Sequence, residues 1–205
     1  MTALKSKQNH TVELLQTIKI SFGHIVALGY LQPLRRYTPP SEENALSLAF
    51  QLIDAVVFMH THSVAHLDIK PDNLLVDVNR SSHHLRVADF SLSVWVNGED
   101  DTIEGYAGTP GWTAPEIGDE NGPIQKYSPI LADRWSCGKM LEYFGRLGPG
   151  FKEPSLERLS QALLNNDPAK RPRLPDPQEH STKKRPLATT TQILGKKRRL
   201  PQQVC

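Results

Sequence analysis

Residues 66–75, with the sequence HLDIKPDNLL, are the stretch around which the rest of this chain is arranged. We refer to it as the central loop. It supplies an acid at Asp68, a cation at Lys70, a rigid turn at Pro71 and a carboxamide at Asn73. Because proline fixes its own φ angle and has no N–H, the stretch reads as a shaped loop that holds three polar groups close together. What these groups can do depends on what the flanking sequence adds.

The length and composition indicate a soluble globular protein. A chain of 205 residues can bury a sizeable core, with room for one domain and an extension. Hydrophobic residues make up 38% of the chain and charged residues 22%. The two cysteines, Cys137 and Cys205, cannot form a disulfide framework, which favours a reducing intracellular compartment. No run approaches the roughly 20 apolar residues that cross a bilayer, so we expect neither secretion nor a membrane anchor.

Charge divides the chain into an acidic body and a basic tail. Residues 1–169 hold 14 Lys and Arg against 20 Asp and Glu, whereas residues 170–205 hold 10 against 2. From Leu174 onward the sequence is rich in Pro, Thr and charge and shows no apolar period. Such a segment cannot bury enough apolar surface to fold. We therefore expect residues 174–205 to form a disordered basic tail.

Two basic clusters in this tail resemble a bipartite nuclear localisation signal. They flank the spacer 186–195 and consist of Lys183, Lys184 and Arg185 on one side and Lys196, Lys197, Arg198 and Arg199 on the other. This pattern predicts an importin as a partner and a nuclear location, with the cytoplasm as the alternative. A plain solvated tail and a contact with nucleic-acid phosphates also stay open. The lack of aromatic residues between the charges makes nucleic acid the least favoured of these.

Hydrophobic periodicity predicts a hairpin followed by helices and short strands. The runs 14–20 and 24–31 lie on either side of a Gly-containing break and predict a β-hairpin, although the first run also suits a frayed helix. Residues 41–62 follow two prolines, begin with Ser41 as N-cap and repeat apolar residues at helical spacing. They predict a long amphipathic helix. Short strands are expected at 74–78 and 85–88, and further helices at 130–144 and 155–164.

Four further motifs follow the central loop. Asp89-Phe90-Ser91 comes directly after the second short strand, and residues 108–116, GTPGWTAPE, close a polar, Gly-rich stretch. The expected helix 130–144 contains DRWSCG at residues 133–138, and the last expected helix is followed by NDPAKRP at residues 166–172. With the central loop, the chain thus reads H-x-D-x-K-P-x-N, D-F-S, A-P-E, D-x-W-S-x-G and D-P-x-x-R-P in that order.

This order and spacing resemble the eukaryotic protein kinase superfamily over residues 9–173. A Lys two residues after the central-loop Asp is typical of its Ser/Thr kinases, and residues 108–138 are similar to kinase-domain proteins of mushroom-forming fungi. The resemblance implies an α+β, protein-kinase-like fold that is mainly the helical C-lobe. Residues 1–31 would be a remnant of the N-lobe, with the end of the helix αC region, the last two strands of its sheet and the hinge. Residues 32–173 would be the C-lobe.

The resemblance also implies a reaction, the ATP-dependent phosphorylation of Ser or Thr in a protein substrate, with ATP and Mg²⁺ as cofactors. In this family pattern Asp68 accepts the hydroxyl proton, Lys70 steadies the γ-phosphate, and Asn73 and Asp89 bind Mg²⁺. Adenine would contact the hinge at Gly29 and Leu31 and rest on Leu75. The pattern gives structural roles to Thr109, which would bond Asp68 and Lys70, to Asp133, which would bond the central-loop backbone, and to Glu116 and Arg171, which would form a buried ion pair. Residues 89–116 correspond to the family's activation segment, and we use that name.

The chain departs from the family pattern in three ways. Upstream of the hinge there is no G-x-G-x-x-G loop and no recognisable phosphate-pairing Lys or helix αC Glu. Ser91 stands where glycine is usual, and serine lacks glycine's freedom at positive φ. Leu67 stands where many kinases carry the Arg that receives an activation-segment phosphate. We therefore expect an N-terminally truncated kinase domain, and two alternatives stay open: a catalytically dead pseudokinase that acts as an interaction module, and a truncated gene fragment.

Two weaker features have structural interpretations. His60, His62 and His66 are close in sequence, as in some metal sites, but no Cys or carboxylate completes a ligand set, so structural histidines are favoured. Cys137 falls on an apolar helix face, which predicts a buried, inert thiol.

Overall fold

The computed structural model describes residues 9–21, 23–79, 83–147 and 153–175. The strands are β1 (Leu14–Ile20), β2 (Gly23–Leu28), β3 (Gln32–Pro33), β4 (Val64–Ala65), β5 (Leu74–Asp77), β6 (His84–Val87), β7 (Val94–Trp95), β8 (Ile103–Glu104) and β9 (Lys126–Tyr127). The helices are α1 (Glu42–Thr61), α2 (Pro129–Gly145) and α3 (Pro154–Leu163), with short 3₁₀ turns at Leu34–Arg36, Pro71–Asn73, Pro115–Ile117 and Pro168–Lys170. Helices combined with several small antiparallel sheets form the α+β class that the sequence predicted.

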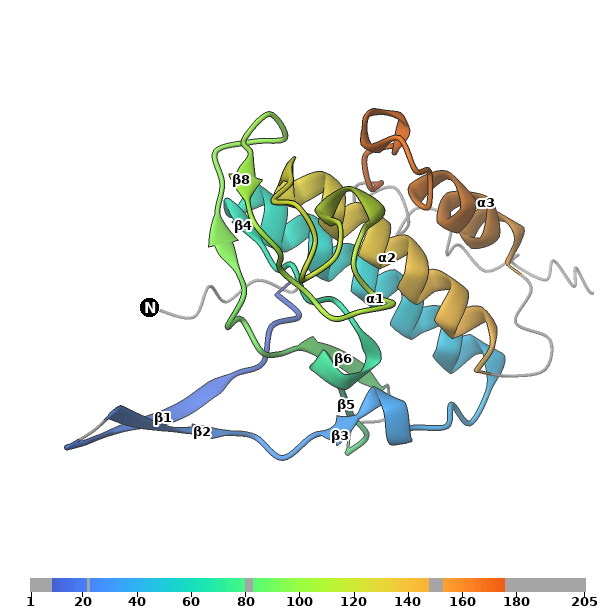
Figure 1. Ribbon diagram of the computed structural model, residues 1–205. Coiled ribbons are helices and arrows are strands. Elements are labelled where there is room, and N and C mark those ends of the chain that lie inside the picture. Colours follow the sequence, from blue (N-terminus) through green and yellow to red (C-terminus); the bar gives the residue numbers. More distant parts are fainter. Residues whose placement is uncertain (1–8, 22, 80–82, 148–152, 176–205) are drawn as a thin grey trace, which may run out of the picture.

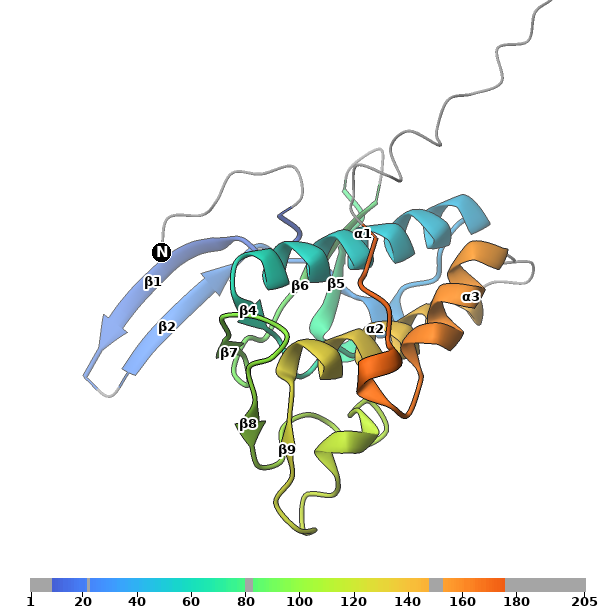
Figure 2. The ribbon, with the colours of Figure 1, turned by 90° about the horizontal axis from the view of Figure 1, so that it is seen from above.

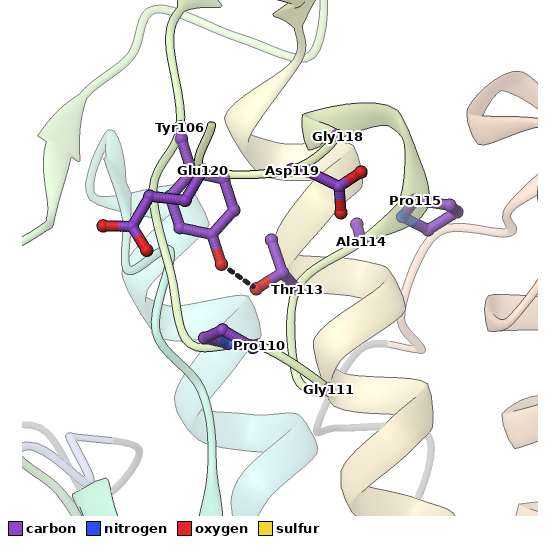
Figure 3. A pocket seen from close by; sticks show the side chains of 9 residues that line it. All are labelled: Tyr106, Pro110, Gly111, Thr113, Ala114, Pro115, Gly118, Asp119 and Glu120. Carbon is purple, nitrogen blue, oxygen red and sulfur yellow. Dashed lines mark hydrogen bonds between the residues drawn. The ribbon is translucent and has the colours of Figure 1, made fainter. Parts of the chain in front are cut away.

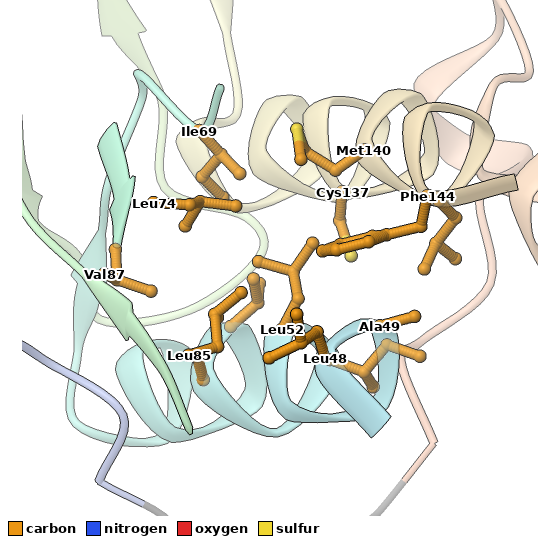
Figure 4. Packing of buried hydrophobic residues seen from close by; sticks show 14 of the residues in the cluster. Leu48, Ala49, Leu52, Ile69, Leu74, Leu85, Val87, Cys137, Met140 and Phe144 are labelled. Carbon is orange, nitrogen blue, oxygen red and sulfur yellow. The ribbon is translucent and has the colours of Figure 1, made fainter. Parts of the chain in front are cut away.

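Helices α1 and α2 lie side by side at the centre of the molecule, and α3 packs against α2 (Figures 1 and 2). Figure 4 shows the core between them, in which Leu48 and Leu52 of α1 face Met140 and Phe144 of α2. Side chains of the central loop and of the short strands close the same core: Ile69, Leu74, Leu85 and Val87. The central loop is therefore anchored in the main hydrophobic core, and the packing of that core restricts its motion.

The predicted long helix is confirmed as α1. Ser41 adopts extended backbone angles, and its Oγ accepts the Asn44 N–H at 3.2 Å, as an N-cap residue does. In the described part of the chain, α1 is also the one helix whose length and hydropathy would suit a membrane span. Its buried side chains account for that hydropathy, because nine of them lie in the protein interior.

Close approach between α2 and α3 depends on Gly138. A Cβ atom at this position would lie 2.8 Å from the Cβ of Leu163, which is closer than real side chains come. Ser160 Oγ donates to the Gly138 carbonyl at 2.9 Å and ties the two helices together. The glycine of the D-x-W-S-x-G motif thus serves helix packing.

Strands β3, β5 and β6 form an antiparallel sheet that carries the hinge region to the central loop. Pro33 pairs with Leu75, and Leu75 pairs with Arg86 on its other side. A further segment joins β6 through the parallel bridge between Thr11 and Val87. There Val87 N donates to the His10 carbonyl at 2.7 Å.

Strands β1 and β2 form the hairpin that the sequence predicted, with Thr17 opposite Val26 in an antiparallel register, so the frayed-helix alternative is wrong. The hairpin extends away from the helices as a two-stranded ribbon (Figure 1). Its apolar side chains are exposed in part, with Leu15 at 61% and Ile18 at 45%. Placing a domain boundary after residue 31 agrees with this shape but stays a prediction.

Leu174 belongs to the folded body, although the sequence assigned it to the tail. Its side chain packs against the main hydrophobic core. One apolar residue with a core site is enough to extend the ordered chain, and averaged composition does not reveal it. The two basic clusters, residues 183–185 and 196–199, lie outside the described residues.

We expect the stability of the protein to fall as the pH falls from about 6.5 to about 4 because of His10. Burial lowers the pKa of His10 from 6.5 to about 4, while its bond to the Leu85 carbonyl acts in the opposite sense. A folded-state pKa below the unfolded value means that protons bind more tightly to the unfolded chain below pH 6.5. The shift is worth about 3 kcal/mol once the pH reaches about 4.

Urea unfolding of the wild type and of His10→Gln at pH 7.5 and pH 4.5 measures this contribution. Carboxylates titrate alike in both proteins and cancel in the difference. The stability difference between the two proteins should therefore shrink at pH 4.5. A difference that does not change with pH would contradict the assignment.

Candidate functional site

One buried carboxylate of α2 binds the backbone of the central loop. Asp133 has no exposed surface, and its two oxygens accept the N–H groups of His66 at 2.7 Å and Leu67 at 2.8 Å. His60 Nε2 donates to the same carboxylate at 3.0 Å. Leu67 has a φ angle of +66°, which side chains other than glycine seldom adopt. Asp133 therefore holds a strained turn directly before Asp68.

The ring of His66 joins the central loop to the start of the activation segment. Its Nδ1 accepts the Asp68 N–H at 3.2 Å, so the ring proton sits on Nε2, which donates to the Ala88 carbonyl at 3.1 Å. The ring also contacts Phe90, with centroids 4.9 Å apart. His66 is thus a structural residue, as is His60. No cluster of three metal-binding side chains occurs among the described residues.

The structure brings Asp68, Lys70, Asn73 and Thr109 into one hydrogen-bonded cluster. Lys70 Nζ donates to Asp68 Oδ2 at 2.7 Å and to Thr109 Oγ1 at 2.6 Å. Thr109 Oγ1 donates to Asp68 Oδ1 at 2.7 Å, and Asn73 Nδ2 donates to Asp68 Oδ2 at 2.8 Å. A carboxylate has about four lone-pair sites, and these bonds use three of them. Among the described residues no donor occupies the fourth site, which is on Asp68 Oδ1.

A backbone hydrogen bond brings the segment that carries Asp89 next to Asn73. Ala88 N donates to the Asn73 carbonyl at 2.9 Å, so Asp89 begins one residue beyond that contact. Asn73 Nδ2 is fixed on Asp68, which leaves Asn73 Oδ1 without a donor in the part of the chain that the structure describes. The Asp89 side chain is exposed, and hydrogen bonds from Ser91 hold the pKa of Asp89 below its ordinary value.

Ser91 does not bear the strain that its sequence position suggested. The positive φ of this turn falls on Asp89, at +62°, and Ser91 is not among the residues with positive φ. Ser91 N instead donates to Asp89 Oδ1 at 3.3 Å. The backbone N–H of Ser91 therefore orients the Asp89 carboxylate, and a glycine at this position would offer the same N–H.

Of the predicted adenine contacts, Leu75 lies in β5, whereas Gly29 and Leu31 precede β3. Leu75 lies opposite Pro33, two residues after Leu31, and Gly29, Leu31 and Leu75 are all half-buried. A hollow of about 520 Å³ opens nearby, lined by Pro33, Arg35, Arg36 and Asp72. Arg35 donates to Asp72 across it at 3.1 Å. The sequence analysis did not predict that Arg35 and Arg36 line a hollow. The one feature that could have pointed to them is that two arginines stand next to each other shortly after the expected hinge.

The base of the activation segment is locked by Glu116 and Arg171. The Arg171 guanidinium is fully buried and donates to both Glu116 oxygens, at 2.5 and 2.7 Å. It also donates to the carbonyls of Leu131 and Asn165, each at 2.9 Å. Two residues 55 positions apart are thereby joined by an ion pair whose buried guanidinium makes four hydrogen bonds, the kind of arrangement that is stable in a protein interior.

A second hollow of about 330 Å³ lies against the end of the activation segment (Figure 3). Its lining is Tyr106, Pro110, Gly111, Thr113, Ala114, Pro115, Gly118, Asp119 and Glu120. Tyr106 and Thr113 are bonded across it at 3.4 Å, and Thr113 Oγ1 donates to the Thr109 carbonyl at 2.6 Å. The hollow thus adjoins the Asp68 cluster. Sequence motifs marked this segment but did not reveal the depression, which arises where the segment folds back on itself.

Comparisons with known proteins agree with this geometry. A family model described as "Protein kinase domain" matches residues 25–152, more than half of the chain. The chain is 41% identical over 101 residues to CBL-interacting protein kinase 8 of Oryza sativa subsp. japonica, which covers 49% of this chain and 21% of that protein. It is 33% identical over 146 residues to CBL-interacting serine/threonine-protein kinase 10 of Arabidopsis thaliana, with 60% and 29% covered.

The chain spans about a quarter of the length of these relatives. The matched region includes β3, α1, the central loop, the activation segment and α2. It thus contains Asp68, Asn73 and Asp133, around which the cluster is built. This chain belongs to the protein kinase family.

Proposed function

We propose that this chain phosphorylates Ser or Thr hydroxyls of protein substrates with ATP. The observation that carries the proposal is the cluster in which Asp68, Lys70 and Thr109 are all hydrogen-bonded to one another. In this cluster an acid with one unused acceptor site lies beside a cation. The family and its Ser/Thr kinase relatives support the substrate class.

The chemistry follows from the open acceptor site of Asp68. A substrate hydroxyl that donates to Asp68 Oδ1 is oriented for attack on the γ-phosphorus of ATP. The new O–P bond forms as the bond to the β,γ-bridging oxygen breaks, ADP leaves, and the hydroxyl proton passes to Asp68. Lys70 places positive charge within reach of the moving phosphoryl oxygens.

The oxygens near the cluster suit Mg²⁺. Asn73 Oδ1 lacks a protein donor among the described residues, and Asp89 presents an exposed, ionised carboxylate one residue beyond the Asn73 contact. Hard oxygen ligands of this kind are the ones Mg²⁺ prefers. When bound, the ion would neutralise charge on the phosphates, and Asn73 and Asp89 would hold it.

A thermal-shift experiment tests nucleotide binding. We expect ATP with Mg²⁺ to raise the melting temperature of the full chain, because a ligand that binds only the folded state stabilises it by mass action. Asp89→Ala should abolish the shift, and Asp100→Ala, an exposed acid of the same segment, should preserve it. An equal shift in both variants would count against Asp89 as a ligand.

A second candidate function is an interaction module without catalysis. The exposed apolar side chains of the β1–β2 ribbon favour it, since exposed apolar patches commonly mark contact surfaces. A cooperative melt that ATP and Mg²⁺ do not move would support this candidate. A chain that shows no cooperative melt would favour the other alternative, a truncated gene fragment.

The basic clusters of residues 183–185 and 196–199 support a further proposal, nuclear import through an importin. Fusing residues 175–205 to a fluorescent reporter tests it. A nuclear reporter that becomes cytoplasmic when the second cluster is changed to alanine is the expected result. A reporter that stays in the cytoplasm would rule out import by this segment.

A further inference from the structure

Two consecutive residues of α2 hold two different parts of the site. Asp133 binds the backbone of the central loop, whereas Arg134 binds Glu99 of the activation segment. Neighbouring helix positions point about 100° apart, so one turn of α2 reaches both segments at once. The relative position of the central loop and the activation segment is therefore set by a single rigid element.

The contact between Arg134 and Glu99 is a bidentate ion pair. The NH1 and NH2 groups of Arg134 donate to the two Glu99 oxygens at 3.1 and 2.6 Å. The Arg134 side chain is 7% exposed, and its Nε has no partner among the described residues. The pKa of Glu99 is held below its ordinary value, chiefly by these bonds from Arg134. Glu99 is thus the counter-charge of the buried Arg134, and its Oε1 also accepts from Nε of the exposed Arg173 at 2.9 Å.

The backbone of Glu99 is attached to the same helix. Ser128, the N-cap of α2, donates from Oγ to the Glu99 carbonyl at 2.7 Å. Asp101 accepts the Asn97 N–H at 2.6 Å and shapes the turn that presents Glu99. On the far side of this turn, Ile103 pairs with Tyr127 in the β8–β9 ladder.

Leu67 takes part in a second attachment of the segment. It is buried in an apolar cluster with Ala114, Ile117, Tyr127 and Ala132. At this position the chain offers no cation for a phosphate, and hydrophobic contacts join the central loop to the activation segment instead. A carboxylate held by arginine and an apolar cluster are both permanent features, whereas a phosphate must be added.

We infer that Glu99 and Arg134 are positioning residues that hold the activation segment in place without phosphorylation, so that Thr109 meets Asp68 in the unmodified chain. The inference rests on the proposed function where it concerns turnover. Its structural part stands independently, because the ion pair orders residues 97–113 whether or not transfer takes place.

Hydrogen exchange and kinetics on the full, phosphatase-treated chain test the inference. Glu99→Gln should speed backbone exchange in residues 97–113 by about tenfold or more, as expected when hydrogen bonds to a charged group are lost, while α1 and β5 keep their protection. It should lower kcat about tenfold and leave KM for ATP unchanged, since the hinge and Leu75 are not touched. Glu104→Gln, an exposed glutamate of the same segment, should change neither quantity.

Arg134→Met gives a second measure of the same pair. If the pair acts as a unit, the Glu99→Gln/Arg134→Met double variant should lose no more protection than the worse single variant. Equal behaviour of Glu99→Gln and Glu104→Gln, or a wild-type segment that becomes protected only after phosphorylation, would overturn the inference. A protected wild-type segment in a chain that transfers no phosphate would uphold the inference and sink the proposed function.

Discussion

Replacing Asp68 by asparagine is expected to lower kcat by about 10²–10⁴-fold, the range that general acid–base groups contribute. Asparagine keeps the shape of the side chain and one acceptor, so Thr109 can still donate to it. It cannot take up the hydroxyl proton, and its NH₂ group would face the donors Lys70 and Asn73. The KM values should change little, because Asp68 acts on the moving proton and adds little to nucleotide binding.

Steady-state phosphorylation of a Ser-containing protein substrate measures this effect. The matched control is Asp72→Asn in the same loop, whose carboxylate is exposed and contacts Arg35. That variant should keep its kcat within a few-fold, because exposed ion pairs contribute little. If Asp68→Asn retained wild-type kcat, the assignment of Asp68 as proton acceptor would be wrong.

Removing the Asp133 carboxylate is expected to lower the free energy of unfolding by about 3–5 kcal/mol. Asp133→Ala would leave the N–H groups of His66 and Leu67 buried without acceptors, and His60 would lose its partner. The positive φ of Leu67 would also lose the bonds that maintain it. Transfer activity should fall with stability, because the same turn positions Asp68.

Urea unfolding of Asp133→Ala and of Asp119→Ala provides the comparison. Asp119 is an exposed acid on the rim of the second hollow, and its removal should change stability by less than about 0.5 kcal/mol. Asp133→Asn keeps one acceptor oxygen and should fall between the two. Similar losses in Asp133→Ala and Asp119→Ala would show that the central loop is held by other contacts.

The sequence alone predicted most of the secondary structure. The N-cap at Ser41, the periodicity of α1 and α2, and the short strands β5 and β6 follow from backbone preferences that each segment carries by itself. The main departures are small: strand β2 ends at Leu28, before the expected end at residue 31, and Leu174 lies in the body. Element ends depend on neighbours that the local sequence does not contain.

The candidate site also contains residues that the sequence predicted and residues that only the structure revealed. Its motifs supplied Asp68, Lys70, Asn73 and Thr109 as residue types at fixed spacings, and the structure joins them through hydrogen bonds. The sequence did not predict the Glu99–Arg134 pair or the two hollows. Each depends on side chains brought together from distant positions, and a single sequence does not contain that information.

The sequence motifs identified the polar groups by residue type and local spacing, and their resemblance to protein kinases implied the fold class. The tertiary structure added what the motifs do not contain: the positive φ of Leu67 in the turn that Asp133 holds, the bond from Ser91 N to Asp89, and the attachment of both the central loop and the activation segment to α2. The physical reason is that a hydrogen bond acts only within about 3 Å and at a favourable angle. Such distances between remote residues exist only after the core between α1 and α2 has formed.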